Sequence, residues 1–184
     1  MNKGKKILVI VDMQNDFVNG ALGNETTKAV VPNIVKKLTE HYAEYDAIYF
    51  TRDIHFENYM ETLEGVKLPV MHCQKEDNGC KIVKEIWDIV KKLRKDNRFI
   101  RVVDKHTFAS KELVDYLFAT CNKNDIIEFC GVCTDICVVS NVICTRAALP
   151  NNVIMVDANC CAGVTEESHK AALTTMASCQ IDII

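Results

Sequence analysis

The sequence predicts a three-layer α/β/α fold, with a mainly parallel sheet of six strands between two layers of helices. Three observations predict it. Six short apolar runs recur along the chain, most of them are β-branched and almost continuously apolar, and segments with helical spacing separate them. Continuous apolar runs are typical of strands buried on both faces. Strand–helix alternation then implies a parallel sheet with right-handed crossovers.

The elements follow one another in a regular order. We expect strands at 6–12, 46–52, 99–105, 125–131, 152–158 and 180–184, and helices at 28–44, 80–95, 110–121, 134–148 and 165–178. In the helix 80–95, for example, Ile82, Ile86, Ile89 and Leu93 recur at helical spacing, while lysines fill the opposite face. The segment 53–79 shows no such pattern. A long irregular stretch inside a compact α/β domain is usually functional.

Length and charge limit the class of protein. A chain of 184 residues has room for one domain, which we expect to span 1–184. Its net charge is -3 and it has no long run of like charges, so neither a nucleic acid nor a membrane surface is expected as a partner. No apolar stretch approaches the roughly 18 residues of a membrane helix, and the N-terminus lacks the pattern of a signal peptide. We therefore expect a cytoplasmic protein.

The chain contains 10 cysteines, which should remain free thiols in a reducing compartment. Five of them lie among apolar or small residues, and we expect these to be small buried side chains. They are Cys121, Cys144, Cys160, Cys161 and Cys179.

Three further cysteines, Cys130, Cys133 and Cys137, lie in the segment FCGVCTDICVV. A zinc site would need a second pair of ligands at matching spacing, which is missing, and a redox pair is disfavoured because Cys130 is still inside a strand. Cys137 lies in the first turn of the next helix, where unpaired N–H groups and the helix dipole favour a thiolate. Spacing alone leaves two hypotheses open, three packed core thiols or one nucleophile.

Reactive side chains follow four of the expected strands. Asp12 closes the first, Asp53 and then His55 follow the second, Lys105 closes the third, and Cys137 follows the fourth. In an open parallel sheet, ligands bind outside the carboxyl ends of the strands. The combination of acids, histidine, lysine and thiol at one edge therefore favours a catalytic cleft.

Five segments together resemble the isochorismatase-like cysteine hydrolases, and among them most closely the nicotinamidases and pyrazinamidases. They are VIVDMQNDF (9–17), TRDIH (51–55), EGVKLPVMHC (64–73), VDKHTFAS (103–110) and GVCTDICV (131–138). The resemblance covers nearly the whole chain. It implies the isochorismatase-like hydrolase fold, a six-stranded parallel sheet between helices, which agrees with the element pattern.

The resemblance implies a catalytic triad of Asp12, Lys105 and Cys137. Cys137 would attack the carbon of a small carboxamide, nicotinamide first, and form a thioester. Asp12 would carry the thiol proton to the departing ammonia, and Lys105 would hold both groups by its charge. The backbone N–H groups of Cys133 and Cys137 would form the oxyanion hole, with a cis peptide bond between Val132 and Cys133.

The resemblance also implies a divalent metal beside the nucleophile, Zn²⁺ first, with Mn²⁺ or Fe²⁺ as alternatives. Asp53, His55 and His72 match the family's ligands, and D-x-H already places two side chains on one side of an extended segment. For the remaining ligand we expect Glu64 rather than Glu61. We also expect a homo-oligomer.

The substrate pocket departs from the family pattern. Phe17 matches an aromatic that packs on the substrate, and Phe108 lies where the family has an aromatic wall. Nicotinamidases often carry a tryptophan just before the metal histidine, whereas the only tryptophan here, Trp87, is expected in a helix and in the core. Another small amide or a ureide is therefore the alternative substrate, and a non-catalytic binding module on the same fold is the alternative function. His41 and His169 are expected on helix surfaces.

Overall fold

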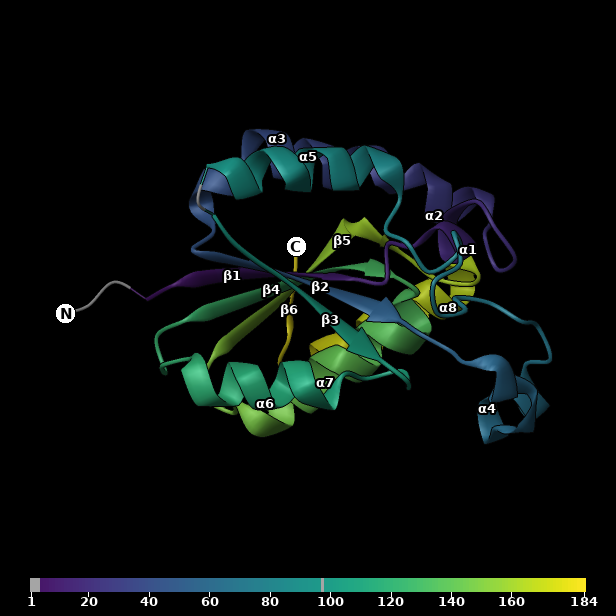
Figure 1. Ribbon diagram of the computed structural model, residues 1–184. Helices are drawn as coiled ribbons and strands as arrows, with labels where there is room; N and C mark the ends of the chain where they lie inside the picture. The colour runs from purple at the N-terminus through teal and green to yellow at the C-terminus, as the bar shows by residue number, and fades with distance from the viewer. Residues whose placement is uncertain (1–3, 97) are drawn as a thin grey trace.

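The computed structural model describes residues 4–96 and 98–184 and contains one six-stranded sheet (Figure 1). Its strands lie in the order β3-β2-β1-β4-β5-β6, and every pairing between them is parallel. The strands are β1 Lys6–Val11, β2 Ala47–Asp53, β3 Phe99–Lys105, β4 Ile126–Val132, β5 Val153–Ala162 and β6 Asp182–Ile183. The predicted fold class is confirmed.

Helices cover both faces of the sheet. α3 (Val31–Glu40) and α5 (Lys84–Lys95) lie on one face, and α6 (Lys111–Thr120) and α7 (Val139–Ala148) lie on the other (Figure 1). The last helix, α8 (Glu166–Ser178), packs beside α7. Because the sheet is buried between these layers, the central strand β1 exposes almost none of its apolar side chains.

The structure corrects several boundaries. α3 begins at Val31 rather than at 28, because Pro32 suits the first turn of a helix. α5 begins at Lys84, and Ile82 instead pairs with Gln14 in an isolated bridge. Four short helical segments were not predicted, since so few residues show no periodicity. They are α1 Asn15–Val18, α2 Glu25–Ala29, α4 Leu63–Lys67 and the turn Glu57–Glu61.

Gly131 allows β4 to lie close to β1 at the edge where the two strands end. Its φ is +116°, and a Cβ added there would lie 2.1 Å from the carbonyl oxygen of Val11. Only glycine tolerates both this backbone conformation and this contact. The residues that follow these two strands, Asp12 and Cys133, are thereby brought side by side.

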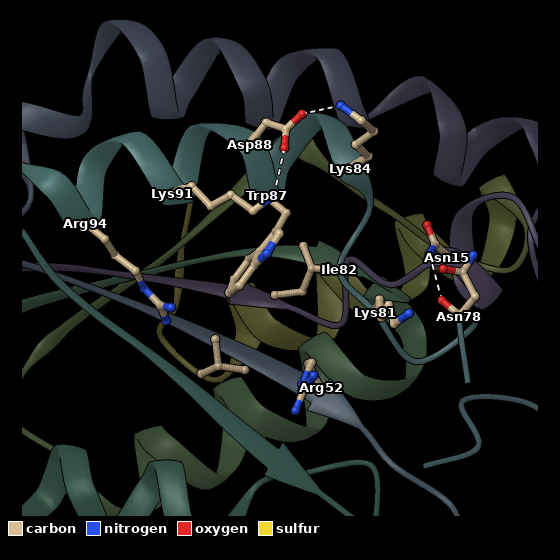
Figure 2. A pocket seen from close by; sticks show the side chains of 11 residues that line it. Asn15, Arg52, Asn78, Lys81, Ile82, Lys84, Trp87, Asp88, Lys91 and Arg94 are labelled. Carbon is tan, nitrogen blue, oxygen red and sulfur yellow. Dashed lines mark hydrogen bonds and ion pairs between the residues drawn. The ribbon is translucent and has the colours of Figure 1, made fainter. Parts of the chain in front are cut away.

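A depression of about 560 Å³ lies along α5, lined mostly by charged side chains, and Trp87 forms part of its wall (Figure 2). The prediction that Trp87 belongs to the core is confirmed only in part, because the indole is partly exposed. It packs against the core, and the guanidinium of Arg94 lies 5.0 Å from its ring centroid. None of the predicted site residues lines this depression.

All 10 cysteines lie in the described residues, and all are free thiols. Cys160 and Cys161 are buried as predicted, and Cys121 is partly buried. The prediction is wrong for Cys144 and Cys179, which are exposed. Cys144 lies on the outer face of α7, and Cys179 follows the last turn of α8. None of the helices described by the structure is long and apolar enough to span a membrane.

Candidate active site

The three residues of the implied triad meet at the carboxyl edge of the sheet. Asp12 follows β1, Lys105 ends β3, and Cys137 lies in the turn after β4. The ammonium nitrogen of Lys105 is 2.8 Å from Asp12 Oδ2 and 3.6 Å from Cys137 Sγ. All three side chains are buried. The structure therefore brings a carboxylate, an ammonium group and a thiol together away from bulk water.

Asp12 is held by its own backbone and by Thr51. Its φ is +47°, in the left-handed region that residues other than glycine seldom adopt. The hydroxyl of Thr51 donates to Asp12 Oδ1 at 2.7 Å, and the carbonyl oxygen of Thr51 accepts from the Asp12 amide at 3.3 Å. These contacts fix the carboxylate at the end of β1 with one oxygen turned toward Lys105.

Burial and the neighbouring charges shift the pKa of all three groups. It raises the pKa of the Cys137 thiol well above its usual range, and the nearby charge of Lys105 only reduces this effect. It also raises the pKa of Asp12, again against the effect of Lys105. Burial opposes the charge on Lys105, but Asp12, Cys137 and Asp53 outweigh it and raise the pKa of the lysine. Burial therefore opposes the thiolate that the helix start and Lys105 favour at Cys137, and the Asp12 carboxyl beside it also has a raised pKa.

The turn Thr134–Val138 replaces the regular first helical turn that the sequence predicted. It has the wider spacing of a π-helix, in which the carbonyl of Cys133 accepts from the amides of Ile136 (3.1 Å) and Val138 (3.0 Å). In an α-helix the Cys137 amide would donate to the Cys133 carbonyl. Here the amides of Ile136 and Val138 donate to it instead. Single π-turns of this kind are frequent at functional sites. The peptide bond Val132–Cys133 is cis, as the resemblance implied.

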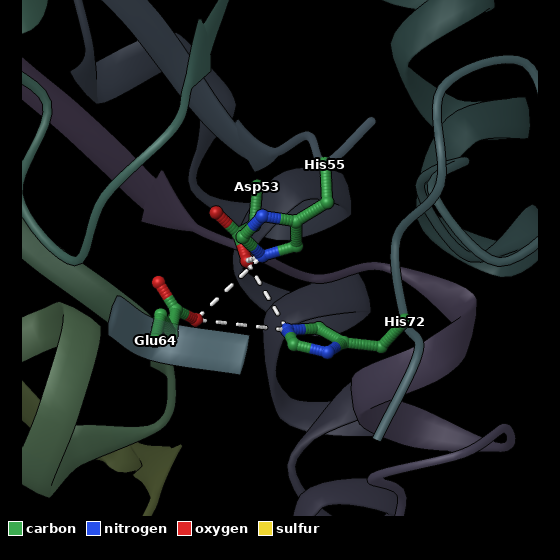
Figure 3. A group of neighbouring side chains, drawn as sticks. All are labelled: Asp53, His55, Glu64 and His72. Atoms are coloured by element: carbon green, nitrogen blue, oxygen red, sulfur yellow. Dashed lines mark hydrogen bonds and ion pairs between the residues drawn. The ribbon is translucent and has the colours of Figure 1, made fainter. Parts of the chain in front are cut away.

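Asp53, His55, Glu64 and His72 form the second cluster, and Figure 3 shows their side chains pointing toward one another. One ligand atom from each lies within 4.8 Å of all the others. His55 Nε2 is 2.8 Å from Asp53 Oδ2 and 3.6 Å from Glu64 Oε1. His72 Nε2 is 3.5 Å from Asp53 Oδ2.

This donor set fits a divalent metal ion. Two imidazole nitrogens and two carboxylate oxygens suit Zn²⁺, Mn²⁺ or Fe²⁺. The Val70 carbonyl accepts from His72 Nδ1 at 2.8 Å, which leaves Nε2 facing Asp53 and Glu64. A metal-binding histidine is commonly oriented in this way. Glu64 belongs to the cluster, whereas Glu61 is exposed and does not.

Lys105 connects the two clusters, because its ammonium nitrogen also lies 3.3 Å from Asp53 Oδ1. The position of Asp53 is fixed by Gln14, which is fully buried. The Asp53 amide donates to Gln14 Oε1 at 2.6 Å, and Gln14 Nε2 donates to the Asp53 carbonyl at 2.8 Å. The triad and the candidate metal ligands therefore form one connected polar unit.

Both clusters open into one cavity of about 190 Å³. Its lining includes Cys133 and Cys137 together with Asp53, Glu64 and His72. Apolar side chains make up most of the remaining wall, with Asn24 as the other polar residue. They are Phe17, Leu22, Leu68, Phe108, Ile136 and Val164. The cavity therefore suits a small molecule with both apolar and polar groups.

Residues 6–184 match the family model of the isochorismatase domain. The chain belongs to the isochorismatase family. The resemblance seen in the five sequence segments is thereby confirmed. No curated protein matches the sequence closely enough to add a relative.

Solved structures of this fold include several nicotinamidases and pyrazinamidases. A pyrazinamidase/nicotinamidase from Streptococcus mutans UA159 is 26% identical, with a TM-score of 0.84 over 97% of this chain and 99% of that chain. A pyrazinamidase of Pyrococcus horikoshii in complex with zinc is 21% identical, with a TM-score of 0.78 over 98% of each chain. The yeast nicotinamidase is 18% identical, with a TM-score of 0.78 over 97% of this chain and 99% of that chain. The last two likenesses show the fold alone.

Some supporting residues of this isochorismatase-family site were missed by the sequence reasoning. Thr51 and Gln14 lie inside the segments that carried the resemblance, and that location was a usable signal. Asn141, on α7, donates to the carbonyls of Cys137 (2.8 Å) and Phe108 (3.1 Å), and so joins the thiol-bearing turn to the cavity wall. No sequence motif indicated this buried residue.

Proposed function

We propose that this member of the isochorismatase family is a metal-assisted cysteine amidohydrolase that cleaves a small carboxamide, with nicotinamide as the first candidate substrate. The observation that carries the proposal is the position of the Cys137 thiol. It lies beside Lys105 and Asp12 in the same small cavity as the four candidate metal ligands. The likeness to the Streptococcus mutans enzyme at 26% identity supports an amide C–N bond as the one that is cleaved.

The geometry supports a two-stage reaction on Cys137. As the thiol sulfur attacks the carboxamide carbon, Asp12 accepts the thiol proton. The C–N bond then breaks, Asp12 returns that proton to the nitrogen, and ammonia leaves a thioester on Cys137. A water molecule attacks the thioester with Asp12 again as base, which releases the carboxylic acid and restores the thiol. The raised pKa of Asp12 suits both steps, because it makes the carboxylate a better base and its acid a usable donor.

The charge that develops on the carboxamide oxygen needs donors in fixed positions. The backbone amides of Cys133 and Cys137 fill this role in the proposal. The π-turn supports it, since the carbonyl of Cys133 is bonded by Ile136 and Val138 and does not engage the Cys137 amide. Lys105 stabilises the charge on both the sulfur and Asp12 during proton transfer.

Asp53, His55, Glu64 and His72 are the residues that would hold the metal. A divalent cation bound there would supply a Lewis acid for a lone pair of the substrate and so orient the carboxamide. Zinc is the first metal to test, because the Pyrococcus horikoshii pyrazinamidase was solved with it. Phe17 packs edge-on against His72, with ring centroids 5.6 Å apart, and can therefore contact a planar ring held beside the ligand cluster.

Substituting Glu64 and Glu61 in turn, and titrating metal into chelator-treated protein, should show which of the two carboxylates binds the metal. We expect zinc binding at one ion per chain, and Glu64→Gln should weaken zinc affinity on the order of tenfold to a hundredfold. Glu61→Gln is the matched control, since Glu61 is exposed and lies outside the cluster. Calorimetric titration of chelator-treated protein measures both affinities. Equal affinities for the Glu64→Gln variant and the wild type would contradict the proposed ligand set.

The amide itself is tested by ammonia release from zinc-loaded protein. We expect nicotinamide to be hydrolysed faster than benzamide, because benzamide has the same ring size but no ring nitrogen for the metal. A panel of ureides tests the second candidate, which is favoured by Met71 at the position before His72, where nicotinamidases often carry a tryptophan. Faster turnover of a ureide would assign a different substrate to the site and would leave the proposed cysteine mechanism in place. Failure to release ammonia from any amide or ureide would contradict the proposed function.

A further inference from the structure

The 134–138 turn is bonded to α8 by a partly buried hydrogen bond. The side chain of Thr134 is fully buried, and its hydroxyl lies 2.8 Å from Nδ1 of His169. His169 was predicted to be a helix-surface residue, but it is partly buried and its ring faces the turn. Burial lowers the pKa of His169 although Asp135 and Glu166 are nearby, so the neutral ring can accept the hydroxyl proton. A buried hydroxyl requires such a partner.

A second contact holds the same turn against the segment before α8. Asp135 Oδ1 accepts from the Val164 amide at 3.0 Å. Gly163 lies so close that an added Cβ would be 2.9 Å from Asp135 Oδ1 and from the Cβ of His169. The turn is therefore clamped between Lys105 and Asn141 on the cavity side and α8 on the other. Of these contacts, the Thr134–His169 bond lies closest in sequence to the amide of Cys133.

Thr134 directly follows Cys133, whose amide is one of the two proposed oxyanion donors. The bond from its hydroxyl to His169 therefore restrains the backbone next to that donor. Hydrogen bonds to a developing oxyanion act only when the donors are already aimed at its position. Attack by the sulfur depends instead on Cys137, three residues further along, which Lys105 and Asn141 hold independently of His169.

We propose that His169 is a positioning residue that fixes the oxyanion-binding turn through the hydroxyl of Thr134. The inference rests on the proposed amidohydrolase function of the same cavity. It predicts that loss of the bond slows amide turnover and leaves the reactivity of the Cys137 thiol unchanged. Binding of substrate should also change little, because His169 does not line the cavity.

Four single variants and one double variant test this role. His169→Ala should lower kcat by roughly tenfold to a hundredfold with little change in KM, as expected for a misplaced catalytic group. His169→Asn should restore most of the activity, because the asparagine amide places a polar atom where Nδ1 was. His169→Gln should not, because its amide lies near the position of Nε2. Thr134→Val should match His169→Ala, and the two effects should not add in the double variant.

The reactivity of the Cys137 thiol distinguishes a specific effect of His169 on the oxyanion-binding turn from a general disturbance of the active site. Methyl methanethiosulfonate has no carbonyl for the oxyanion amides, so it should modify Cys137 at the wild-type rate in His169→Ala. Mass spectrometry must resolve the site, since Cys144 and Cys179 are exposed and also react. His41→Ala is the matched control, because His41 is an exposed histidine at the end of α3, far in sequence from the turn. It should leave kcat unchanged.

The outcomes distinguish two failures. If the wild type hydrolyses an amide and His169→Ala does so at the same kcat, only the positioning role is overturned. A parallel fall of kcat, thiol reactivity and melting temperature would also overturn it, in favour of a purely structural role. Equal activity of His169→Asn and His169→Gln would do the same. If the wild type releases no ammonia from any amide, the proposed function and this inference fail together.

Discussion

Replacing Cys137 by alanine is expected to lower kcat/KM for amide hydrolysis by at least about 10,000-fold, because loss of a nucleophile removes the covalent route altogether. The fold should survive, since the side chain is small and alanine retains its Cβ. Zinc affinity should not change, because Cys137 is not one of the clustered ligands. Ammonia release and calorimetric zinc titration of the same preparation measure the two quantities.

The matched control for this variant is Cys144→Ala. Cys144 lies in α7, the helix that follows the turn containing Cys137, and its side chain is exposed. It should therefore be dispensable for turnover. A Cys137→Ala variant that keeps more than a trace of activity, while Cys144→Ala behaves like the wild type, would show that water attacks the amide directly. The metal cluster would then be the catalytic centre and the thiol a packed side chain, which was the alternative that cysteine spacing alone left open.

Replacing Lys105 by methionine is expected to reduce both activity and stability. The ammonium group lies between Asp12 and Asp53, at 2.8 Å and 3.3 Å, and all three side chains are buried. Its removal leaves two buried carboxylates without their shared counterion, which costs about 3–5 kcal/mol of unfolding free energy. Turnover should fall on the order of 100- to 10,000-fold, because proton transfer between Cys137 and Asp12 loses its stabilising charge.

Urea unfolding and ammonia release measure these two effects. The loss of stability should be larger in chelator-treated protein than in zinc-loaded protein, because a bound cation also compensates the charge of Asp53. Lys111→Met is the control, since Lys111 is a solvent-exposed lysine at the start of α6. If Lys105→Met unfolds at the wild-type urea concentration and keeps its turnover, Lys105 is not the link between the two clusters.

The fold could be predicted from the sequence, and so could the meeting of the reactive side chains at one edge of the sheet, because both depend on local patterns. Buried strands are apolar along their length, and a parallel sheet collects the residues after each strand at one edge. Asp12, Asp53, Lys105 and Cys137 were found in this way before any resemblance was considered. Glu64 needed the resemblance, because α4 is only five residues long and shows no periodicity.

The errors concern contacts between distant parts of the chain. The helix start around Cys137 favours a thiolate, whereas burial by distant segments has the opposite effect and raises the pKa of the thiol. His169 looked like a surface residue because nothing near it in sequence marks it, while its partner Thr134 lies 35 residues away. Asn141 and Gln14 were missed for a similar reason, since each acts through carbonyl and amide groups of residues elsewhere in the chain.

The central claim is that the reaction passes through an acyl group on Cys137, and mass spectrometry of enzyme quenched in acid during turnover tests it most directly. We predict that intact protein gains the mass of the substrate acyl group, that the adduct maps to Cys137, and that hydroxylamine removes it as expected for a thioester. Steady ammonia release with no adduct on Cys137, at every quench time and also at low temperature, would contradict the account.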